Sequence, residues 1–210
     1  MLRIIQGLLF AGALAISAVV QAQNVSALVV AVNGDVRLDA GSRAGVEAFT
    51  RLFDGDKVRL GKEASLSLIY PRSGRQENWT GVGAIAVAAS GESQIQSGKP
   101  SLEVRVLPAK LAQQIARTPS TDASGKAGMV RMRNLPGEES PAEVEKNYLS
   151  LREAAPTNDH TPEIYLLAGL RDVGAVARLS EELGRLERAY PEDRNMQKLI
   201  AIYRKTLEAR

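Results

Sequence analysis

The feature that most constrains this chain is a series of short alternating segments, separated by glycine-containing turns, over residues 27–107. Residues 52–70 show it most clearly. The turn Asp54-Gly55-Asp56 precedes two segments, 57–60 and 65–70, in which apolar side chains recur at every second position. An alternating strand presents one buried face and one solvated face. Turn signals recur at about the 8–12-residue spacing that is typical of an all-β sandwich or barrel.

Further strands are predicted from the same pattern. Apolar or alternating segments occupy 27–32, 36–38, 76–79, 84–89 and 102–107. The dipeptide Asn33-Gly34 tolerates positive φ in tight turns, so we expect a hairpin that joins 27–32 to 36–38. These segments together predict a β sandwich or roll domain over residues 23–108.

The apolar period changes from two to about three and a half beyond residue 138. Ser140 and Glu143 form a capping box around Pro141, which predicts the start of a helix. A second helix is expected to begin at Thr161-Pro162, and a third to be capped by Asp172. Pro191 separates the third helix from a fourth. The predicted fold class is therefore α+β, in which the N-terminal all-β sandwich or roll is followed by a small helical array over residues 138–210.

Residues 109–137 lie between these two regions and change in character. Lys110–Arg117 is expected to form a short helix. The following Thr118–Gly125 is small, polar and rich in turn formers, which predicts an exposed, flexible linker.

The N-terminus has the organisation of a secretory signal peptide. Arg3 precedes an apolar run over residues 4–20, and Val20-Gln21-Ala22 supplies the small residues of a cleavage site. We expect cleavage after Ala22 and a periplasmic location; the alternative is a retained membrane anchor, because the run approaches the length that spans a bilayer. The chain has no cysteine, so disulfides do not contribute to its stability and a lipid anchor on a cysteine is excluded. The mature chain is expected to be soluble.

The charge of the chain argues against nucleic-acid binding. Removal of Arg3 leaves 26 basic and 24 acidic residues of the 27 and 24 in the full chain, and neither half carries a clustered basic excess. Nucleic-acid and anionic-membrane surfaces require such an excess. No nucleic-acid partner is therefore expected.

Candidate catalytic and metal-binding residues are few. His160 is the only histidine, so neither a multi-histidine metal site nor a serine triad with a Gly-x-Ser-x-Gly elbow is available. We expect His160 to be a solvated residue that precedes a helix. Asp54 and Asp56 resemble a calcium pair but lack the other ligands of an EF-hand loop, and a structural turn is favoured.

Two glycine-containing segments suggest nucleotide or phosphate binding. Residues 81–86 match the relaxed dinucleotide fingerprint G-x-G-x-x-A, but the following residues read as a strand, where the fingerprint requires a helix. Residues 97–101 suggest a phosphate loop, but they lack its first glycine, and Pro100 removes one of the needed amides. We therefore predict glycines that allow sharp bends between strands, and no cofactor.

Three aromatic residues are candidates for a ligand groove. Phe53, Tyr70 and Trp79 fall in predicted strands or turns. Exposed rings would stack on sugars and favour a cell-wall or polysaccharide binding module, whereas buried rings would only fill the core. Core packing is the favoured interpretation, and no binding residue is assigned.

The β region resembles a FecR-type periplasmic domain. The resemblance rests on Gly34-Asp35-Val36, on the Leu52–Leu60 segment with its Gly55-Asp56 turn, on the 64–68 strand and on Ser73-Gly74. It implies a small periplasmic β structure used for protein contact or sensing, and it supplies no catalytic residues. The C-terminal helices loosely resemble tetratricopeptide-like pairs, although no 34-residue period repeats.

These observations predict a non-enzymatic protein without a metal or small-molecule cofactor. Its expected role is that of a protein-binding adaptor or sensor in the cell envelope, with an envelope or periplasmic protein as partner. The membrane is involved only if the signal segment is retained. The alternative function is a cell-wall or polysaccharide binding module.

Overall fold

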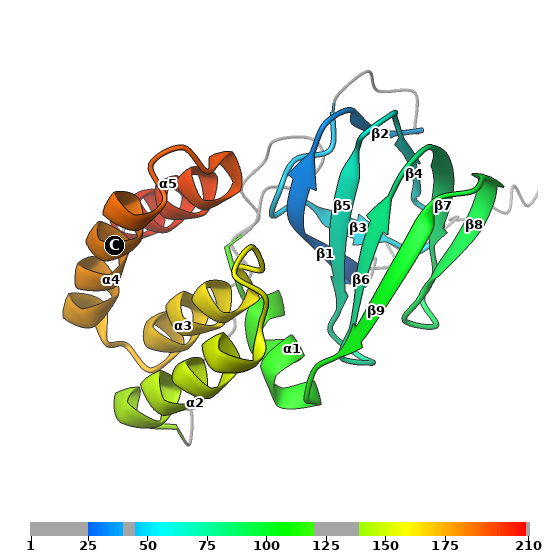
Figure 1. The fold of residues 1–210 in the computed structure, drawn as a ribbon. Coiled ribbons are helices and arrows are strands. Elements are labelled where there is room, and N and C mark those ends of the chain that lie inside the picture. The colour runs from blue at the N-terminus through cyan, green and yellow to red at the C-terminus, as the bar shows by residue number, and fades with distance from the viewer. Residues whose placement is uncertain (1–24, 40–44, 120–138, 209–210) are drawn as a thin grey trace, which may run out of the picture.

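The computed structural model describes residues 25–39, 45–119 and 139–208, and shows a two-sheet β region followed by helices (Figure 1). The signal peptide predicted over residues 1–22 and most of the predicted linker lie outside the described residues. The linker prediction is wrong at its first residue, because Thr118 is fully buried after α1. The α+β class is confirmed. The elements are β1 (Val25–Asn33), β2 (Val36–Leu38), β3 (Arg51–Phe53), β4 (Lys57–Leu60), β5 (Ser65–Tyr70), β6 (Arg75–Thr80), β7 (Gly83–Val87), β8 (Ser93–Gly98), β9 (Ser101–Val106), α1 (Ala109–Ala116), α2 (Pro141–Ala154), α3 (Thr161–Asp172), α4 (Val176–Ala189) and α5 (Arg194–Glu208).

The strands form two antiparallel sheets that pack face to face. One sheet has the order β3-β1-β5-β6-β9 and the other has the order β2-β4-β7-β8. Alternate residues of β4 are buried, as its sequence predicts, because only one face of the strand meets the opposite sheet. Leu66, Leu68 and Tyr70 of β5 likewise face the opposite sheet, whereas the intervening Ile69 is buried on the other face. The core between the sheets contains aliphatic side chains from both, together with Tyr70 and Trp79.

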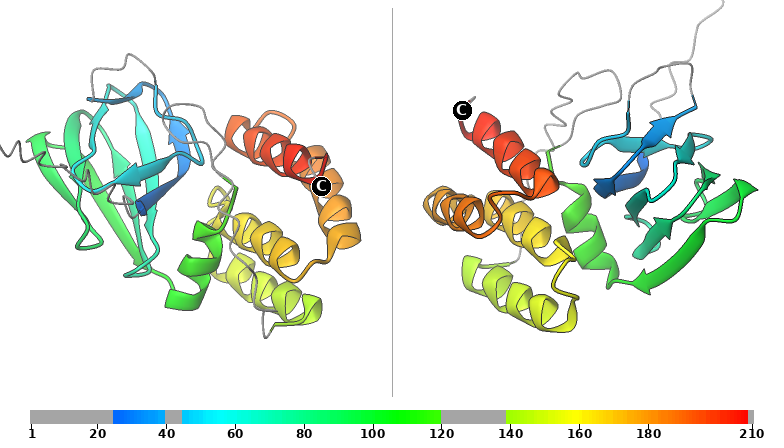
Figure 2. Two further views of the ribbon diagram at one scale, coloured as in Figure 1. Left: turned by 180° about the vertical axis from the view of Figure 1, so that it is seen from behind. Right: turned by 45° about the horizontal axis from the view of Figure 1, so that its top comes forward.

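The helices cover the outer face of the five-stranded sheet, and both views of Figure 2 keep them on this one side of the β region. Leu28, Val30 and Ile69 point away from the sandwich core and share a single hydrophobic cluster with residues of all five helices. This cover explains the uninterrupted apolar run of β1, because a strand that is buried on both faces has no solvated side. The Asn195 side chain also bonds both the amide and the carbonyl of Val32, which fixes the start of α5 against β1.

The predicted hairpin between the first two strands is wrong. β1 pairs with β3 and β5, whereas β2 pairs with β4 in the other sheet. Gly34 has a φ of 74°, and a Cβ at this position would lie 3.0 Å from the Cα of Ala64. Positive φ at Asn-Gly is therefore used to pass the chain from one sheet to the other, which the dipeptide alone does not distinguish from a hairpin.

The helix predictions hold at three of four starts. The capping box of Ser140 and Glu143 is present at α2, α3 begins at Thr161, and a break at residues 190–193 precedes α5. The predicted cap at Asp172 is wrong, because this residue ends α3, where it forms ion pairs with Arg117 and Arg171. Gly174, with a φ of 73°, makes the turn into α4.

Candidate functional site

His160 is largely buried, so the prediction of a solvated histidine is wrong. Its side chain is 13% exposed, and its Nε2 lies 2.8 Å from a carboxylate oxygen of Asp193. The ring also contacts Tyr190 edge-on, with 4.8 Å between centroids. Although partial burial of Asp193 would raise the pKa of its carboxyl, hydrogen bonds from the Met196 amide and from His160 lower that pKa. His160 therefore links the start of α3 to the start of α5.

A second buried charge lies beside this histidine. Glu163 on α3 is 1% exposed and accepts a hydrogen bond from Arg152 of α2 at 3.1 Å. Arg152 also donates to the carbonyl of Asp159, and the Tyr148 hydroxyl donates to Glu163. Such a buried pair requires additional hydrogen bonds to offset its desolvation. The Glu163 carboxylate is fully used by these contacts, which join α2 to α3.

The candidate aromatic groove does not exist at the surface. Trp79 is 1% exposed and Tyr70 is fully buried, which confirms the core interpretation for both. Neither ring can stack on a sugar, so the polysaccharide hypothesis loses the exposed aromatics on which it depended. Phe53, at the end of β3, is only partly buried.

The turn interpretation of Asp54 and Asp56 is confirmed. The Asp56 carboxylate accepts the Phe53 amide and the Asp54 carboxylate accepts the Ala89 amide, each at 2.8 Å. Both side chains thus cap backbone groups. Among the residues that the structure describes, no group of three or more acidic, histidine or cysteine side chains is placed to hold a metal ion.

The two glycine-containing segments also have structural roles. Residues 81–86 run into β7, where the dinucleotide fingerprint requires a helix. Gly98 ends β8 with a φ of 75°, and a Cβ there would lie 2.6 Å from the carbonyl oxygen of Val82. Both segments are bends between closely packed strands, as predicted.

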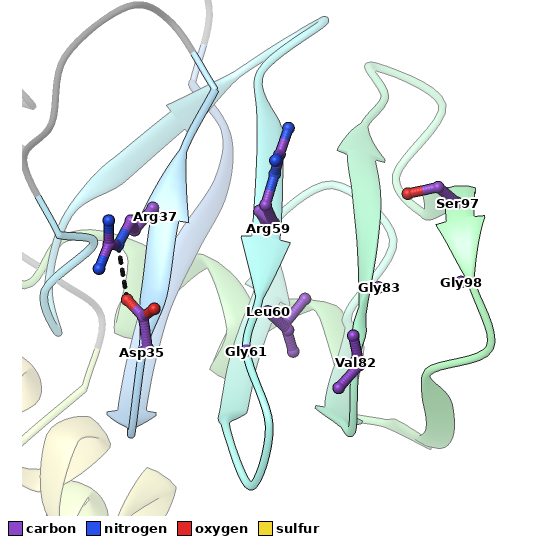
Figure 3. A pocket seen from close by; sticks show the side chains of 9 residues that line it. All are labelled: Asp35, Arg37, Arg59, Leu60, Gly61, Val82, Gly83, Ser97 and Gly98. Atoms are coloured by element: carbon purple, nitrogen blue, oxygen red, sulfur yellow. Dashed lines mark hydrogen bonds and ion pairs between the residues drawn. The ribbon is translucent and has the colours of Figure 1, made fainter.

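A shallow hollow lies on the four-stranded sheet (Figure 3). Its volume is about 520 Å³, and Arg37 and Arg59 are its basic side chains. Arg37 pairs with Asp35 at 2.7 Å and Arg59 with Asp39 at 3.0 Å, and all four side chains are about half exposed. The arginines are thus balanced by carboxylates at high solvent exposure, where ion pairs contribute little. We assign no ligand to this hollow, which is lined by Asp35, Arg37, Arg59, Leu60, Gly61, Val82, Gly83, Ser97 and Gly98.

The most unusual surface is the open edge, which we define as the neighbouring free strands β8 and β9. Among the described strands, β8 pairs only with β7, and β9 pairs only with β6. Leu102, Val104 and Val106 of β9 stand opposite Trp79, Glu77 and Arg75 of β6. Directly opposed residues share a face of the sheet, so these aliphatic side chains point toward the inside of the sandwich. They are nevertheless 36%, 40% and 72% exposed.

The other sheet contributes Ile95 to the same edge. Ile95 of β8 stands opposite the fully buried Ile85, and is 53% exposed. Side chains that face inward from both sheets are thus left uncovered where the sandwich ends. Figure 1 shows β8 at the margin of the β region that lies away from the helices, and β9 running down toward α1.

On its outer side, the backbone of β9 also has no partner among the residues that the structure describes. The Leu107 amide donates to the Gly74 carbonyl across the β6–β9 ladder. Because amides alternate in direction along a strand, those of Glu103 and Arg105 point toward β6, and those of Leu102, Val104 and Val106 point outward. The three aliphatic residues therefore present both side chains and unpaired backbone groups to a partner.

A buried polar network anchors the edge at one end. The fully buried Glu77 carboxylate accepts hydrogen bonds from Arg75 at 2.7 Å, from the Trp79 indole at 2.9 Å and from the Ser93 amide at 3.1 Å. The Tyr70 hydroxyl lies 2.6 Å from the Ser93 hydroxyl, and burial raises the pKa of Tyr70. Because Ser93 begins β8, this network ties the four-stranded sheet to the five-stranded sheet.

Sequence reasoning did not identify the open edge. The alternation of residues 102–107 predicted a buried apolar face, and 93–98 was not recognised as a strand. The signal that was present is the polar composition of Ser93–Gly98, in which Ile95 alone is aliphatic, because such a strand cannot cover its neighbour.

No protein-family model, curated protein or solved structure matches this chain. Among the described helices, none has the length and apolar character needed to cross a membrane.

Proposed function

We propose that this chain is a non-enzymatic protein of the cell envelope that acts as a protein-binding adaptor or sensor, and that it binds through the open edge. The observation that carries this proposal is the exposed aliphatic row of Leu102, Val104 and Val106 on a strand whose outer backbone edge no described strand pairs with. The signal-like N-terminus and the resemblance of the β region to a FecR-type domain support the location and the role.

The chemistry of this edge favours a protein as its ligand. Soluble proteins usually protect edge strands with charged side chains, lysine above all, with proline or with bulges. β9 contains no lysine or proline and pairs with β6 without a register shift, so its protection is limited to Glu103 and Arg105, which lie on the opposite face from the aliphatic row. An extended segment of a partner gains backbone hydrogen bonds from such an edge, and gains specificity from the alternate side chains. The exposed apolar residues of β8 and β9 supply the surface area that a partner would bury.

The helices have a supporting role in this proposal. Their shared cluster with Leu28, Val30 and Ile69 holds the five-stranded sheet rigid from its outer side. A tetratricopeptide-like binding groove between helices remains part of the proposal only as a second surface for the same adaptor role.

Photo-crosslinking in the native envelope tests the proposed function. A photoreactive amino acid is placed at Ile95 or Val104, and at Val176 on α4 as the control, because Val176 and Val104 are 41% and 40% exposed. We expect Ile95 to capture a defined envelope protein that Val176 does not capture, and Val104 to capture a protein at the same edge, either that partner or a second copy of this chain. Equal capture at all three positions, or no protein captured at the edge, would overturn the proposal.

A further inference from the structure

We propose that the β9 half of the open edge pairs with β9 of a second copy of this chain, in antiparallel register about a two-fold axis at Val104. This inference rests on the proposed function, because it names the partner of one strand of the same edge. The sequence Leu102-Glu103-Val104-Arg105-Val106 reads as an aliphatic row with one acidic and one basic residue placed symmetrically about its centre.

The register follows from the charges. In a two-fold pair centred on Val104, Glu103 of each copy stands opposite Arg105 of the other. An axis at Glu103 would place two carboxylates opposite each other, and an axis at Arg105 would place two guanidinium groups opposite each other. Opposed like charges destabilise a sheet and opposed unlike charges stabilise it. The Val104 register is therefore favoured among the three central registers.

The backbone of the strand fits the same register. Val104 would pair with itself, and Leu102 would pair with Val106. These residues point their amides and carbonyls outward. The Val104–Val104 and Leu102–Val106 pairs would therefore be hydrogen-bonded pairs. The alternate pair, Glu103 with Arg105, becomes a non-hydrogen-bonded pair, in which opposed side chains approach more closely. The positions that carry charge are thus those in which a cross-strand ion pair is strongest.

Both charged side chains reach solvent. Glu103 is exposed and forms no ion pair with any residue that the structure describes, while Arg105 is partly exposed and forms an ion pair with Asp159 at 3.1 Å. Glu103 of the second copy would therefore share the Arg105 guanidinium with Asp159. The aliphatic row of each copy would cover that of the other, because opposed residues lie on the same face. A strand from an unrelated protein would not require this internal charge symmetry.

Single-cysteine variants test the register directly, because the natural chain contains no cysteine. Disulfides require Cα atoms about 4.4–6.8 Å apart. We expect purified Val104→Cys to form a disulfide dimer under mild oxidation. Leu102→Cys alone should form little, since in this register its two copies are separated by about 13 Å along the strand. A mixture of Leu102→Cys with Val106→Cys should form the mixed disulfide, because these positions are opposed.

Val176→Cys is the matched control for nonspecific oxidation, since Val176 is 41% exposed and Val104 is 40% exposed. Equal dimer yields for Val104→Cys, Leu102→Cys and Val176→Cys would overturn the register. Charge substitutions test the electrostatic argument by sedimentation. Glu103→Arg should weaken self-association by about tenfold, and so should Arg105→Glu. A mixture of the two variants should recover association, because each strand then opposes the complementary charges of the other.

The outcomes separate this inference from the proposed function. A protein that sediments as a monomer at all accessible concentrations, yet crosslinks at Val104 to another envelope protein, would overturn self-pairing and leave the adaptor role intact. Self-pairing with no foreign protein captured at Ile95 or Val104 would support this inference and overturn the adaptor role.

Discussion

The five-stranded sheet carries two rows of aliphatic side chains that differ in solvent exposure. Leu28, Val30 and Ile69 on its outer face are nearly inaccessible, because helices cover them. The row of Leu102, Val104 and Val106 at its β9 edge has the same chemistry and remains exposed, because no described element covers it. Apolar side chains are stabilised by removal from water in either place. The first row therefore contributes to folding, and the second is available to contribute to association.

This difference separates the residues that determine stability from those that determine binding. Substitutions in the covered row, or in the polar contacts that hold the layers together, should reduce the free energy of unfolding. Substitutions in the exposed row should leave that free energy nearly unchanged and weaken association.

The largest loss of stability is expected at Glu77, beside the open edge but fully buried. Glu77→Ala removes the acceptor for Arg75, Trp79 and the Ser93 amide. Loss of one partner from a buried charge pair costs about 3–5 kcal/mol, which we expect to appear as a lower urea midpoint. Glu103→Ala, on the exposed face of β9, is the control and should change stability by less than about 0.5 kcal/mol. Equal effects of the two substitutions would contradict the role assigned to the network.

The covered row is tested by Ile69→Ala. The Ile69 side chain is fully buried between the five-stranded sheet and the helices. Truncation of a buried isoleucine costs about 2–5 kcal/mol. The unfolding transition should remain a single transition, because helices and sheet share one cluster. Separate unfolding of helices and sheet, seen as two transitions by circular dichroism, would show that the two regions are independent domains.

The contact between His160 and Asp193 predicts a pH dependence. The folded-state pKa of Asp193 lies below its unfolded value of about 3.9. The ionised carboxylate therefore stabilises the fold above that unfolded value, and this contribution is lost as pH falls through the folded-state pKa. Asp193→Asn should cost about 1 kcal/mol near pH 7, and the difference from the natural protein should shrink below about pH 4.

The measurement is the free energy of unfolding in urea at several pH values, with Glu192→Gln as the control, because this neighbouring residue is exposed. A cost of Asp193→Asn that stays constant down to pH 2.5 would contradict the assignment.

The smallest effect on stability is expected in the exposed row. Val104→Thr keeps the shape of the side chain and the strand propensity, and should change stability by less than about 0.5 kcal/mol. The same substitution should reduce crosslinking and self-association at the edge, because it places a hydroxyl in the apolar row. If Val104→Thr lowered the free energy of unfolding and left association unchanged, the exposed row would contribute to folding and not to binding, which contradicts the comparison.

The sequence predicted most of this architecture where the physical signal is local. The alternation in 57–60 and 65–70 located β4 and β5, and the capping box of Ser140 located α2, because both signals depend on residues close in sequence. The pairing partner of β1 was not predictable, since Asn33-Gly34 is compatible with a hairpin and with a crossover. The burial of His160 depends on Asp193 and Tyr190, which lie far away in the chain.

The open edge was missed for a related reason. Residues 102–107 carry the same alternation as a buried strand, and exposure depends on whether another strand covers them. That cover is a property of sheet order, which places β8 and β9 at free margins. The presence of the strand was therefore predictable from the sequence, and its position at an open edge was not.

Residue-resolved hydrogen exchange of β9 tests the central claim most directly. In dilute, isolated protein the amides of Leu102, Val104 and Val106 should exchange rapidly, while those of Glu103 and Arg105, which point toward β6, should be protected. In the self-associated or partner-bound protein all five should become protected, because the outer edge is then paired. Protection of all five amides in the isolated chain, or an unchanged alternating pattern in the associated state, would contradict the account.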